Sequence, residues 1–321
     1  MELSSDVKKK AEKIALQWKQ EKLKAVSFLL TERYKNDSGK GKRLAVTKEE
    51  AAVYSVVRMP ATYAAISDAL KYTLKAFPEL SEIDSAIDIG SGTGAAAIAI
   101  CSYFENTREV LCIERERNMR ELGEELTKVY SSVKWISGDI TGTDLSQSAD
   151  LIMESYMLNE LSEENRNRVI DKLWDKTEKV LLLIEPGTMA GFEVLKDARR
   201  RLISRGAYIA APCPHMGECR LSGDDWCHFT ARVQRSKLHK YLKGGDVPYE
   251  DEKFSYMAFV REKPCIKGAR ILRHPITEKG MIKLSLCTSD ENREAVITKK
   301  QGELFKAARK ASCGDAIDLK S

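Results

Sequence analysis

Three glycines at alternate positions form the first group whose spacing suggests chemistry. They lie in Asp88-Ile89-Gly90-Ser91-Gly92-Thr93-Gly94, between a short apolar segment and an alanine-rich segment with helical character. Glycine permits positive φ angles and a close approach of the backbone to a ligand. A helix that begins behind such a loop favours a negatively charged group. Because the spacing is G-x-G-x-G and not G-x-G-x-x-G, the loop differs from that of dinucleotide-binding proteins.

Two acidic residues follow where they would complete a site for S-adenosylmethionine (SAM). Glu114 ends the next predicted strand, where a carboxylate can accept hydrogen bonds from ribose hydroxyls, and Asp139 ends a third, near the expected adenine amino group. The alternative is a structural turn that holds no cofactor. We predict SAM binding by Asp88, Gly90, Ser91, Gly92, Thr93, Gly94, Glu114, Asp139, Ile140 and Glu154.

A second group consists of three cysteines in fifteen residues, Cys213, Cys219 and Cys227. Thiolates at this density bind soft metals. The metal could be zinc, with His215, His228 or a distant cysteine as fourth ligand, or an iron–sulfur cluster held by four cysteines. The pair Pro212-Cys213 also resembles the nucleophile of cytosine-C5 methyltransferases. Its place after the sixth predicted strand, among other cysteines, argues against that role.

The elements that must position these residues follow from the alternation of apolar segments. Short strands at 85–89, 110–113, 133–136, 149–153, 180–184, 207–211 and 254–260 alternate with helical patterns, which predicts an α/β fold with a parallel, doubly wound sheet. Ligands bind at the carboxyl ends of such strands. We expect a helical N-terminal domain (1–80), a class I SAM-dependent methyltransferase domain with a Rossmann-like sheet (81–263) and a small basic C-terminal region (264–321). A Cys-rich metal-cluster insert is expected at 212–250.

Charge is unevenly distributed along the chain, although the net charge is only +5. Residues 1–50 and 261–321 are both basic, and the part between them is acidic. Basic ends suit a polyanion such as RNA; solvated helical faces would look the same. There is no apolar run of about 18 residues, so no membrane span is expected. The N-terminus has the features of neither a signal nor a transit peptide, which predicts a cytoplasmic location.

Several stretches together make the chain similar to the Rsm-twenty-two (Rsm22) type family, methyltransferase-like proteins associated with the small ribosomal subunit in mitochondria, with relatives in bacteria. They are Tyr54-x-x-x-Arg58-x-Pro60-x-x-Tyr63, the glycine loop, Leu158-Asn159-Glu160-Leu161, Glu185-Pro186-Gly187-Thr188, Ala211-Pro212-Cys213-Pro214-His215, Asp225-Trp226-Cys227-His228-Phe229 and the segment Tyr249 to Tyr256. Two positions depart from the family pattern: Arg220 and Cys313 stand where proline and tryptophan are expected.

The resemblance implies a role on 16S-type ribosomal RNA of the small subunit, as a methyltransferase or as an assembly factor. It also implies a [4Fe–4S] cluster held by Cys213, Cys219, Cys227 and Cys287. Cys265 is the rival for the fourth position, and spacing does not decide between them. Binding by Cys287 would clamp the C-terminal region onto the methyltransferase domain.

The function we predict is SAM-dependent methylation of small-subunit rRNA, although no catalytic residue can be named. The fourth strand lacks the Asn/Asp-Pro-Pro-aromatic motif of many amino-group methyltransferases, which leaves Tyr156, Asn159 and Glu160 as candidates for the pocket wall. The alternatives are a non-catalytic assembly factor and a zinc-stabilised methyltransferase of small molecules. Expected contacts to RNA phosphates are Arg199, Arg200, Arg201, Arg232, Arg235 and Lys237.

Overall fold

The centre of the protein is an eight-stranded sheet with the order β3-β2-β1-β4-β5-β8-β6, in which β7 also pairs with β8. The computed structural model describes residues 2–37, 45–266 and 268–319. The strands are β1 (Ser85–Ile89), β2 (Glu109–Glu114), β3 (Val133–Ser137), β4 (Ala149–Ser155), β5 (Thr177–Pro186), β6 (Tyr208–Ala211), β7 (Phe229–Gln234) and β8 (Tyr249–Val260). β1 to β5 are parallel, as predicted, whereas β8 runs antiparallel to β5, β6 and β7.

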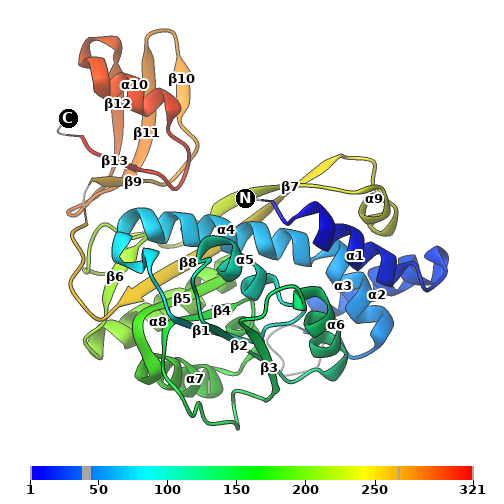
Figure 1. Ribbon diagram of the computed structural model, residues 1–321. Helices are drawn as coiled ribbons and strands as arrows, with labels where there is room; N and C mark the ends of the chain where they lie inside the picture. Colours follow the sequence, from blue (N-terminus) through cyan, green and yellow to red (C-terminus); the bar gives the residue numbers. More distant parts are fainter. Residues whose placement is uncertain (1, 38–44, 267, 320–321) are drawn as a thin grey trace.

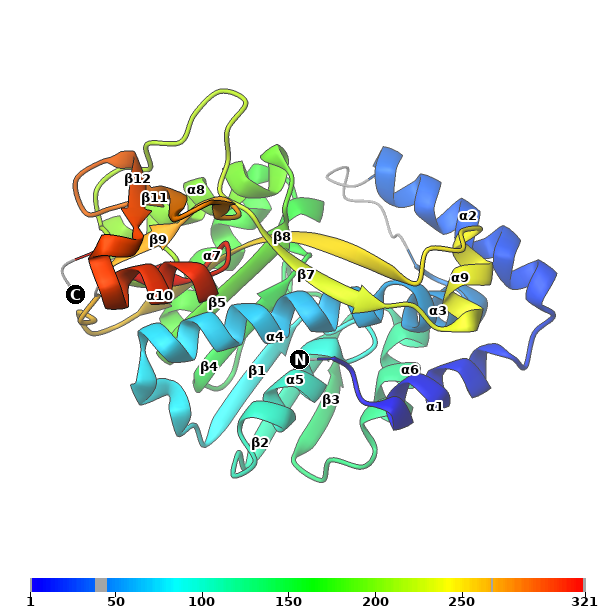
Figure 2. The same cartoon turned by 90° about the horizontal axis from the view of Figure 1, so that it is seen from above.

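Helices cover both faces of this sheet (Figures 1 and 2). They are α1 (Ser5–Ala15), α2 (Gln20–Asp37), α3 (Lys48–Val57), α4 (Met59–Ala76), α5 (Ala95–Tyr103), α6 (Arg117–Thr127), α7 (Glu163–Lys176), α8 (Met189–Ser204) and α9 (Lys237–Lys243), with 3₁₀ turns η1 (Pro78–Ser81) and η2 (Leu158–Glu160). One core joins α1 to α6 to one sheet face, and a second joins α7 and α8 to the other. Strands buried on both faces explain runs such as Val180 to Ile184 in β5.

The N-terminal helices begin at recognisable caps. Thr47 starts α3 with a capping box, in which its hydroxyl accepts from the Glu50 amide and the Glu50 carboxylate accepts from the Thr47 amide. Pro60 lies in the first turn of α4, where its missing N–H costs nothing. α4 begins two residues after the end of α3, and this junction faces the cavity described below.

The segment 212–250, which was predicted as a Cys-rich metal-cluster insert, contains a strand and a helix. Its second half forms β7, which alternates buried and exposed residues against β8, and then α9, which starts at the Ser236 cap and ends at the left-handed Gly244. The longest stretch of this segment without strands or helices is 212–228. The predicted insert therefore divides into a sheet extension and a short irregular loop that carries three cysteines.

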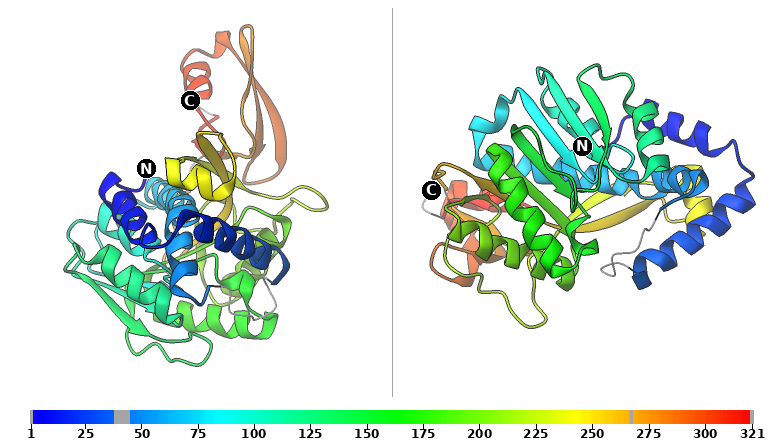
Figure 3. Two further views of the ribbon diagram at one scale, coloured as in Figure 1. Left: turned by 90° about the vertical axis from the view of Figure 1, so that its right-hand side faces the viewer. Right: turned by 90° about the horizontal axis from the view of Figure 1, so that it is seen from below.

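The C-terminal residues form a separate small sheet, which we call the arm (269–317). Its order is β10-β11-β9-β13, with β12 paired to β11. The elements are β9 (Ala269–Ile271), β10 (Ile276–Glu278), β11 (Met281–Cys287), β12 (Asn292–Thr298), η3 (Lys299–Gln301), α10 (Gly302–Lys310) and β13 (Ala316–Ile317). It has its own apolar core, and it projects from the rest of the protein in Figure 1 and in the left view of Figure 3.

Candidate functional site

A cavity of about 260 Å³ lies at the carboxyl ends of the parallel strands. Its inner wall comes from the loops after β1, β2, β3 and β4, and its outer wall from α2, α3, α4 and the segment from α9 to β8. The lining residues include Tyr34, Tyr54, Arg58, Gly90, Gly92, Glu114, Arg115, Asp139, Ile140, Tyr156, Asn159, Glu160, Lys243 and Glu252. This is the place where open α/β sheets bind ligands.

The glycine loop has the backbone geometry that its composition predicts. Gly90, Gly92 and Gly94 all have positive φ angles, of 67°, 53° and 89°. The Gly92 N–H donates to Glu114 Oε2 (2.8 Å), and the Glu116 N–H donates to Glu114 Oε1 (2.6 Å). Burial raises the pKa of Glu114, against the effect of these two amides. The Glu114 carboxylate thus ties the loop to the start of α6 at the cavity wall.

The predicted cofactor residues divide into two groups. Gly90, Gly92, Glu114, Asp139 and Ile140 line the cavity. The other five lie behind it: Asp88, Ser91, Thr93, Gly94 and Glu154. This second group stabilises the glycine loop on the side away from the cavity. For example, the Ser91 hydroxyl donates to the Asp88 carbonyl (2.9 Å).

Asp139 takes part in a local turn as well as in the cavity wall. Its Oδ1 accepts from the Thr141 amide (3.0 Å) and hydroxyl (2.6 Å), and its Oδ2 lies 3.5 Å from Arg115 Nη1. Although partial burial acts in the opposite direction, these contacts lower the pKa of Asp139. The carboxylate therefore stays charged beside the cavity.

Two buried carboxyl groups hold the wall loop after β4. Glu154 Oε1 accepts from the amides of Met157 (2.7 Å) and Leu158 (3.0 Å), and Glu185 Oε1 accepts from the Asn159 amide (3.3 Å). Burial raises the pKa of Glu154 to about 7, and burial together with the neighbouring Glu154 raises the pKa of Glu185. Through their hydrogen bonds to backbone amides, the two carboxyl groups position Met157 and Asn159 in the wall.

Tyr156, which the sequence named as a candidate for the cavity wall, lines the cavity together with Asn159 and Glu160. Tyr156 has a φ of 61°, unusual for a residue with a side chain, and its hydroxyl donates to Glu252 Oε1 (3.0 Å).

Sequence patterns did not identify the outer wall. The Arg58 guanidinium lies 4.2 Å from the centre of the Tyr34 ring. The sequence could have placed Tyr54 and Arg58 together, because residues four apart lie on the same face of a helix. Glu252 and Tyr34 reach the cavity only through the tertiary fold.

The cysteines predicted as metal ligands line a second, smaller cavity at the base of the arm. Cys213, Cys219 and Cys227 come from the loop after β6, and Cys287 from the end of β11. Cys265 is exposed and is not part of this cavity. Within the described ranges, no three histidine, cysteine or acidic side chains converge closely enough to hold a metal ion.

Hydrogen bonds also attach the arm beside this cavity. Buried Arg270 on β9 donates to the carbonyls of Pro212 (2.8 Å) and Gly314, and Arg220 donates to those of Thr288 (3.3 Å) and Ser289 (2.9 Å). Cys313 lies near Cys227, with its thiol 3.3 Å from the Leu272 carbonyl. The arm and the cysteine loop therefore meet in an interface that has polar contacts besides the thiols.

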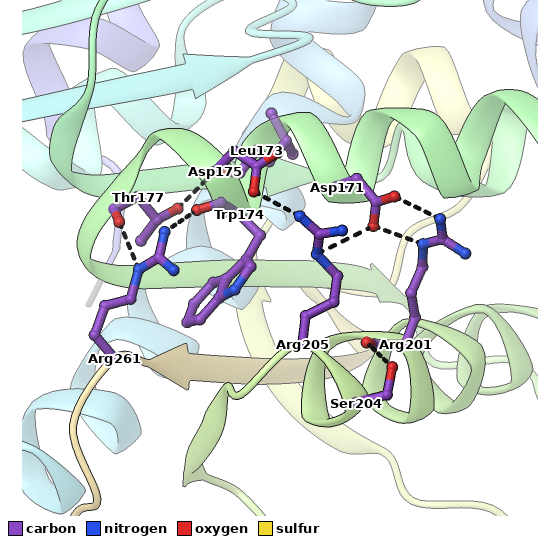
Figure 4. Close-up of polar contacts among 9 residues, drawn as sticks. All are labelled: Asp171, Leu173, Trp174, Asp175, Thr177, Arg201, Ser204, Arg205 and Arg261. Atoms are coloured by element: carbon purple, nitrogen blue, oxygen red, sulfur yellow. Dashed lines mark hydrogen bonds and ion pairs between the residues drawn. The ribbon is translucent and has the colours of Figure 1, made fainter.

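All five arginines expected to contact RNA already have partners within the protein. Arg201 forms a two-pronged contact with Asp171, beside the pair of Arg205 and Asp175 (Figure 4). Buried Arg199 donates to the carbonyls of His215 and Gly217. The remaining pairs are Arg200 with Asp197, Arg232 with Asp251, and Arg235 with Glu250. Only Lys237 of the predicted set is exposed and forms no ion pair in the described structure.

The strand order, with one reversed strand beside β5, defines the class I methyltransferase fold. A profile of the family described as mitochondrial small ribosomal subunit Rsm22 matches residues 48–318. The chain belongs to this Rsm22 family, which confirms the resemblance.

Curated relatives support the same family. The chain is 28% identical over 298 residues to the human "Ribosome assembly protein METTL17, mitochondrial", covering 86% of this chain and 64% of that protein. It is 24% identical over 331 residues to "Rsm22-cox11 tandem protein 2, mitochondrial" of Schizosaccharomyces pombe, covering 85% and 44%. The chain thus spans less than two thirds of the length of either relative.

Solved structures show only distant similarity. The magnesium protoporphyrin IX methyltransferase of Synechocystis with bound SAH has a TM-score of 0.43 and 15% identity, over 64% of this chain and 85% of that one. The N-methyltransferase NodS of Bradyrhizobium japonicum has a TM-score of 0.41 and 12% identity, over 61% and 84%. At these TM-scores and identities, neither similarity supports a conclusion about function.

The relatives correct the predicted location. Each is named as mitochondrial, so the prediction of a cytoplasmic protein is wrong. That prediction rested only on the composition of the first residues, which does not identify a compartment. No helix in the described part of the chain is long and apolar enough to cross a bilayer.

Proposed function

We propose that this protein is an assembly factor of the small ribosomal subunit that binds SAM in its methyltransferase domain. The observation that carries the proposal is the cavity at the strand ends, where the glycine loop meets Glu114 and Asp139. Family membership supports the ribosomal part, since the human relative is named as a ribosome assembly protein. We propose the division into 1–80, 81–263 and 264–321 as the working domain scheme.

The residues in the cavity fit SAM by charge and by shape. SAM carries a positive sulfonium and an ammonium group, and Glu160 and Glu252 add acidic side chains to the wall. Asn159 Oδ1 is buried without a hydrogen-bond donor from the described residues, which leaves it available to an ammonium group. Gly92 lines the cavity without a side chain and so permits a close approach to its backbone, whereas Met157 fills the space beside Gly90. In this proposal Glu114 holds the ribose and Asp139 the adenine side.

The second cavity supports a [4Fe–4S] cluster better than zinc. A single zinc ion needs four donors about 2.0–2.3 Å from one point, an arrangement that the described side chains do not form. A cluster is larger and takes one thiolate at each corner, which suits four thiols spread around one cavity. We propose Cys213, Cys219, Cys227 and Cys287 as its ligands, because Cys265 lies outside the cavity.

Methylation of small-subunit rRNA is the second candidate function. It is favoured by the extension of the cavity past the glycine loop to Tyr156, which lies at the end of β4 in a strained conformation. Bound SAM would supply the methyl group. The Tyr156 hydroxyl, held by Glu252, would orient an acceptor there.

The test uses anaerobically purified protein, tritiated SAM and immature small ribosomal subunits. Gly92→Arg is the blocking variant, because a side chain at this position starts in the cavity wall and at a positive φ. Gly142→Ala is the control, since nothing lies within 4 Å of a Cβ there. We expect SAM binding by the wild type and the control, and a loss of at least tenfold in Gly92→Arg.

Label in the RNA that depends on Gly92 would establish methylation. Subunit binding and SAM binding without label would leave the assembly factor alone. A wild-type protein that binds neither SAM nor subunits would overturn the proposal.

A further inference from the structure

The arm carries an edge of cationic side chains that the fold leaves without partners. Lys299 and Lys300 lie in η3, and Arg309 and Lys310 lie in the last turn of α10. All four are exposed, and none forms an ion pair within residues 2–37, 45–266 and 268–319. We call these four residues the basic edge.

Helix stability does not account for the basic edge as a whole. Cations stabilise the C-terminal end of a helix through its dipole, which explains Arg309 and Lys310. Lys299 and Lys300 lie just before the N-terminal end of α10, where the same dipole disfavours positive charge. Two lysines at that end lower the stability of the helix slightly, so their presence points to an external anion.

The geometry places both pairs on the outside of the arm. α10 turns Leu304 and Ala308 into the core of the arm, and Arg309 and Lys310 are exposed. Nine helical residues span about 14 Å at 1.5 Å each. The arm projects from the body of the protein (Figures 1 and 3). An extended polyanion with closely spaced charges can contact both ends at once, whereas a single small anion cannot.

We propose that the basic edge binds the phosphate backbone of RNA. The proposal rests on the proposed ribosomal function and assigns its RNA contact to α10 and η3. It narrows the sequence prediction that the basic ends suit RNA. It also replaces the arginines named there, because arginines 199, 200, 201, 232 and 235 already have partners within the protein. Contacts of this kind fix position on the RNA without reading its sequence.

The test compares two double variants, Lys299→Glu/Lys300→Glu and Arg309→Glu/Lys310→Glu, with a control of equal charge change. The control is Lys9→Glu/Lys13→Glu on α1, which reverses two exposed lysines that form no ion pair in the described structure. Binding to purified small-subunit rRNA is measured by filter retention over a series of KCl concentrations, with circular dichroism as the folding check. The glutamine versions of both pairs replace any variant that unfolds.

Log K falls as log salt rises, and each phosphate contact adds about 0.7–0.9 to the steepness of this fall. We expect each arm variant to make the fall less steep by about 1 to 2. The control should keep the wild-type slope. If the control and the arm variants lose rRNA binding equally, or if the arm variants keep the wild-type slope, the basic edge does not bind RNA. Either result would leave the proposed ribosomal function standing. Loss of binding to intact subunits but not to naked rRNA would assign the edge to an acidic protein and also overturn it. A wild type that binds neither rRNA nor subunits would overturn both proposals.

Discussion

Single residues behind the cavity decide the shape of its wall. The amides of Met157, Leu158 and Asn159 would lose their acceptors if Glu154 and Glu185 were absent. Burial raises the pKa of both carboxyl groups, and the neighbouring Glu154 also raises that of Glu185. The wall loop therefore depends on the protonation of these buried groups as well as on the fold.

This dependence predicts a pH effect on stability. A carboxyl whose pKa is higher in the folded than in the unfolded protein stabilises the fold below the unfolded value and loses that contribution as the pH rises through the folded value. For Glu154 the folded value is about 7, so the loss falls between about pH 4.5 and 8. Glu154→Gln keeps an acceptor for both amides and removes this ionisation. Between pH 5 and pH 8, the free energy of unfolding of Glu154→Gln should therefore increase by on the order of 2–3 kcal/mol relative to that of the wild type.

Urea unfolding at several pH values measures this difference. Glu105→Gln, at an exposed position, is the matched control and should run parallel to the wild type. If the curves for Glu154→Gln and wild type are parallel as well, burial does not raise the pKa of Glu154 in the folded protein.

At the scale of elements, the sequence identified strands better than their directions and neighbours. Continuous apolar residues and the glycine loop marked β1 with its observed limits. β8 was predicted only from Phe254, because its first residues alternate between partly buried and exposed and pair only with β7. β7 itself alternates between apolar and polar residues, and this two-residue period is present in its sequence. The reversal of β8 depends on which strands it joins, and periodicity carries no such information.

The packing of α6 against β3 gives a prediction at this scale. Alanine usually stabilises a helix by about 1 kcal/mol relative to glycine. Gly123 in α6 is an exception, because a Cβ there would overlap the Trp135 ring, which is held by a hydrogen bond to Thr127 (3.0 Å). Overpacking of this kind costs about 1–3 kcal/mol, so we expect Gly123→Ala to lower the melting temperature.

A second substitution tests the cause. In Gly123→Ala/Trp135→Phe the smaller ring makes room for the new methyl group, and the loss caused by Gly123→Ala should shrink against the Trp135→Phe background. Thermal unfolding followed by circular dichroism measures the change in melting temperature that Gly123→Ala causes in each background. A melting temperature of Gly123→Ala at or above the wild type would show that the ring moves aside freely.

At the scale of the whole molecule, both cavities lie where distant parts of the chain meet. The first needs Tyr34 from α2 and Lys243 from α9 beside the loops of the sheet. The second needs Cys287 from the arm beside Cys213 from the loop after β6. Motifs revealed the inner wall of the first and three thiols of the second, because those residues are close in sequence. The partners that complete them come from long-range packing, and only the family resemblance pointed to Cys287.

The position of Cys287 makes the orientation of the arm depend on the cysteine site. A ligand held by both parts adds a bond that unfolding of their interface must break, whereas Arg270 and Arg220 supply only hydrogen bonds to carbonyls. Cys287→Ser should therefore reduce the iron content of anaerobically purified protein and speed proteolysis between β8 and β9. Because exposed Cys265 lies in that connection but outside the cavity, Cys265→Ser should leave both unchanged. Loss of iron in Cys265→Ser with normal iron in Cys287→Ser would reverse the ligand assignment. Normal proteolysis of iron-depleted Cys287→Ser would show that the other contacts of the arm, which include the ion pairs of Arg273 with Asp225 and of Lys75 with Asp315, hold it without the ligand.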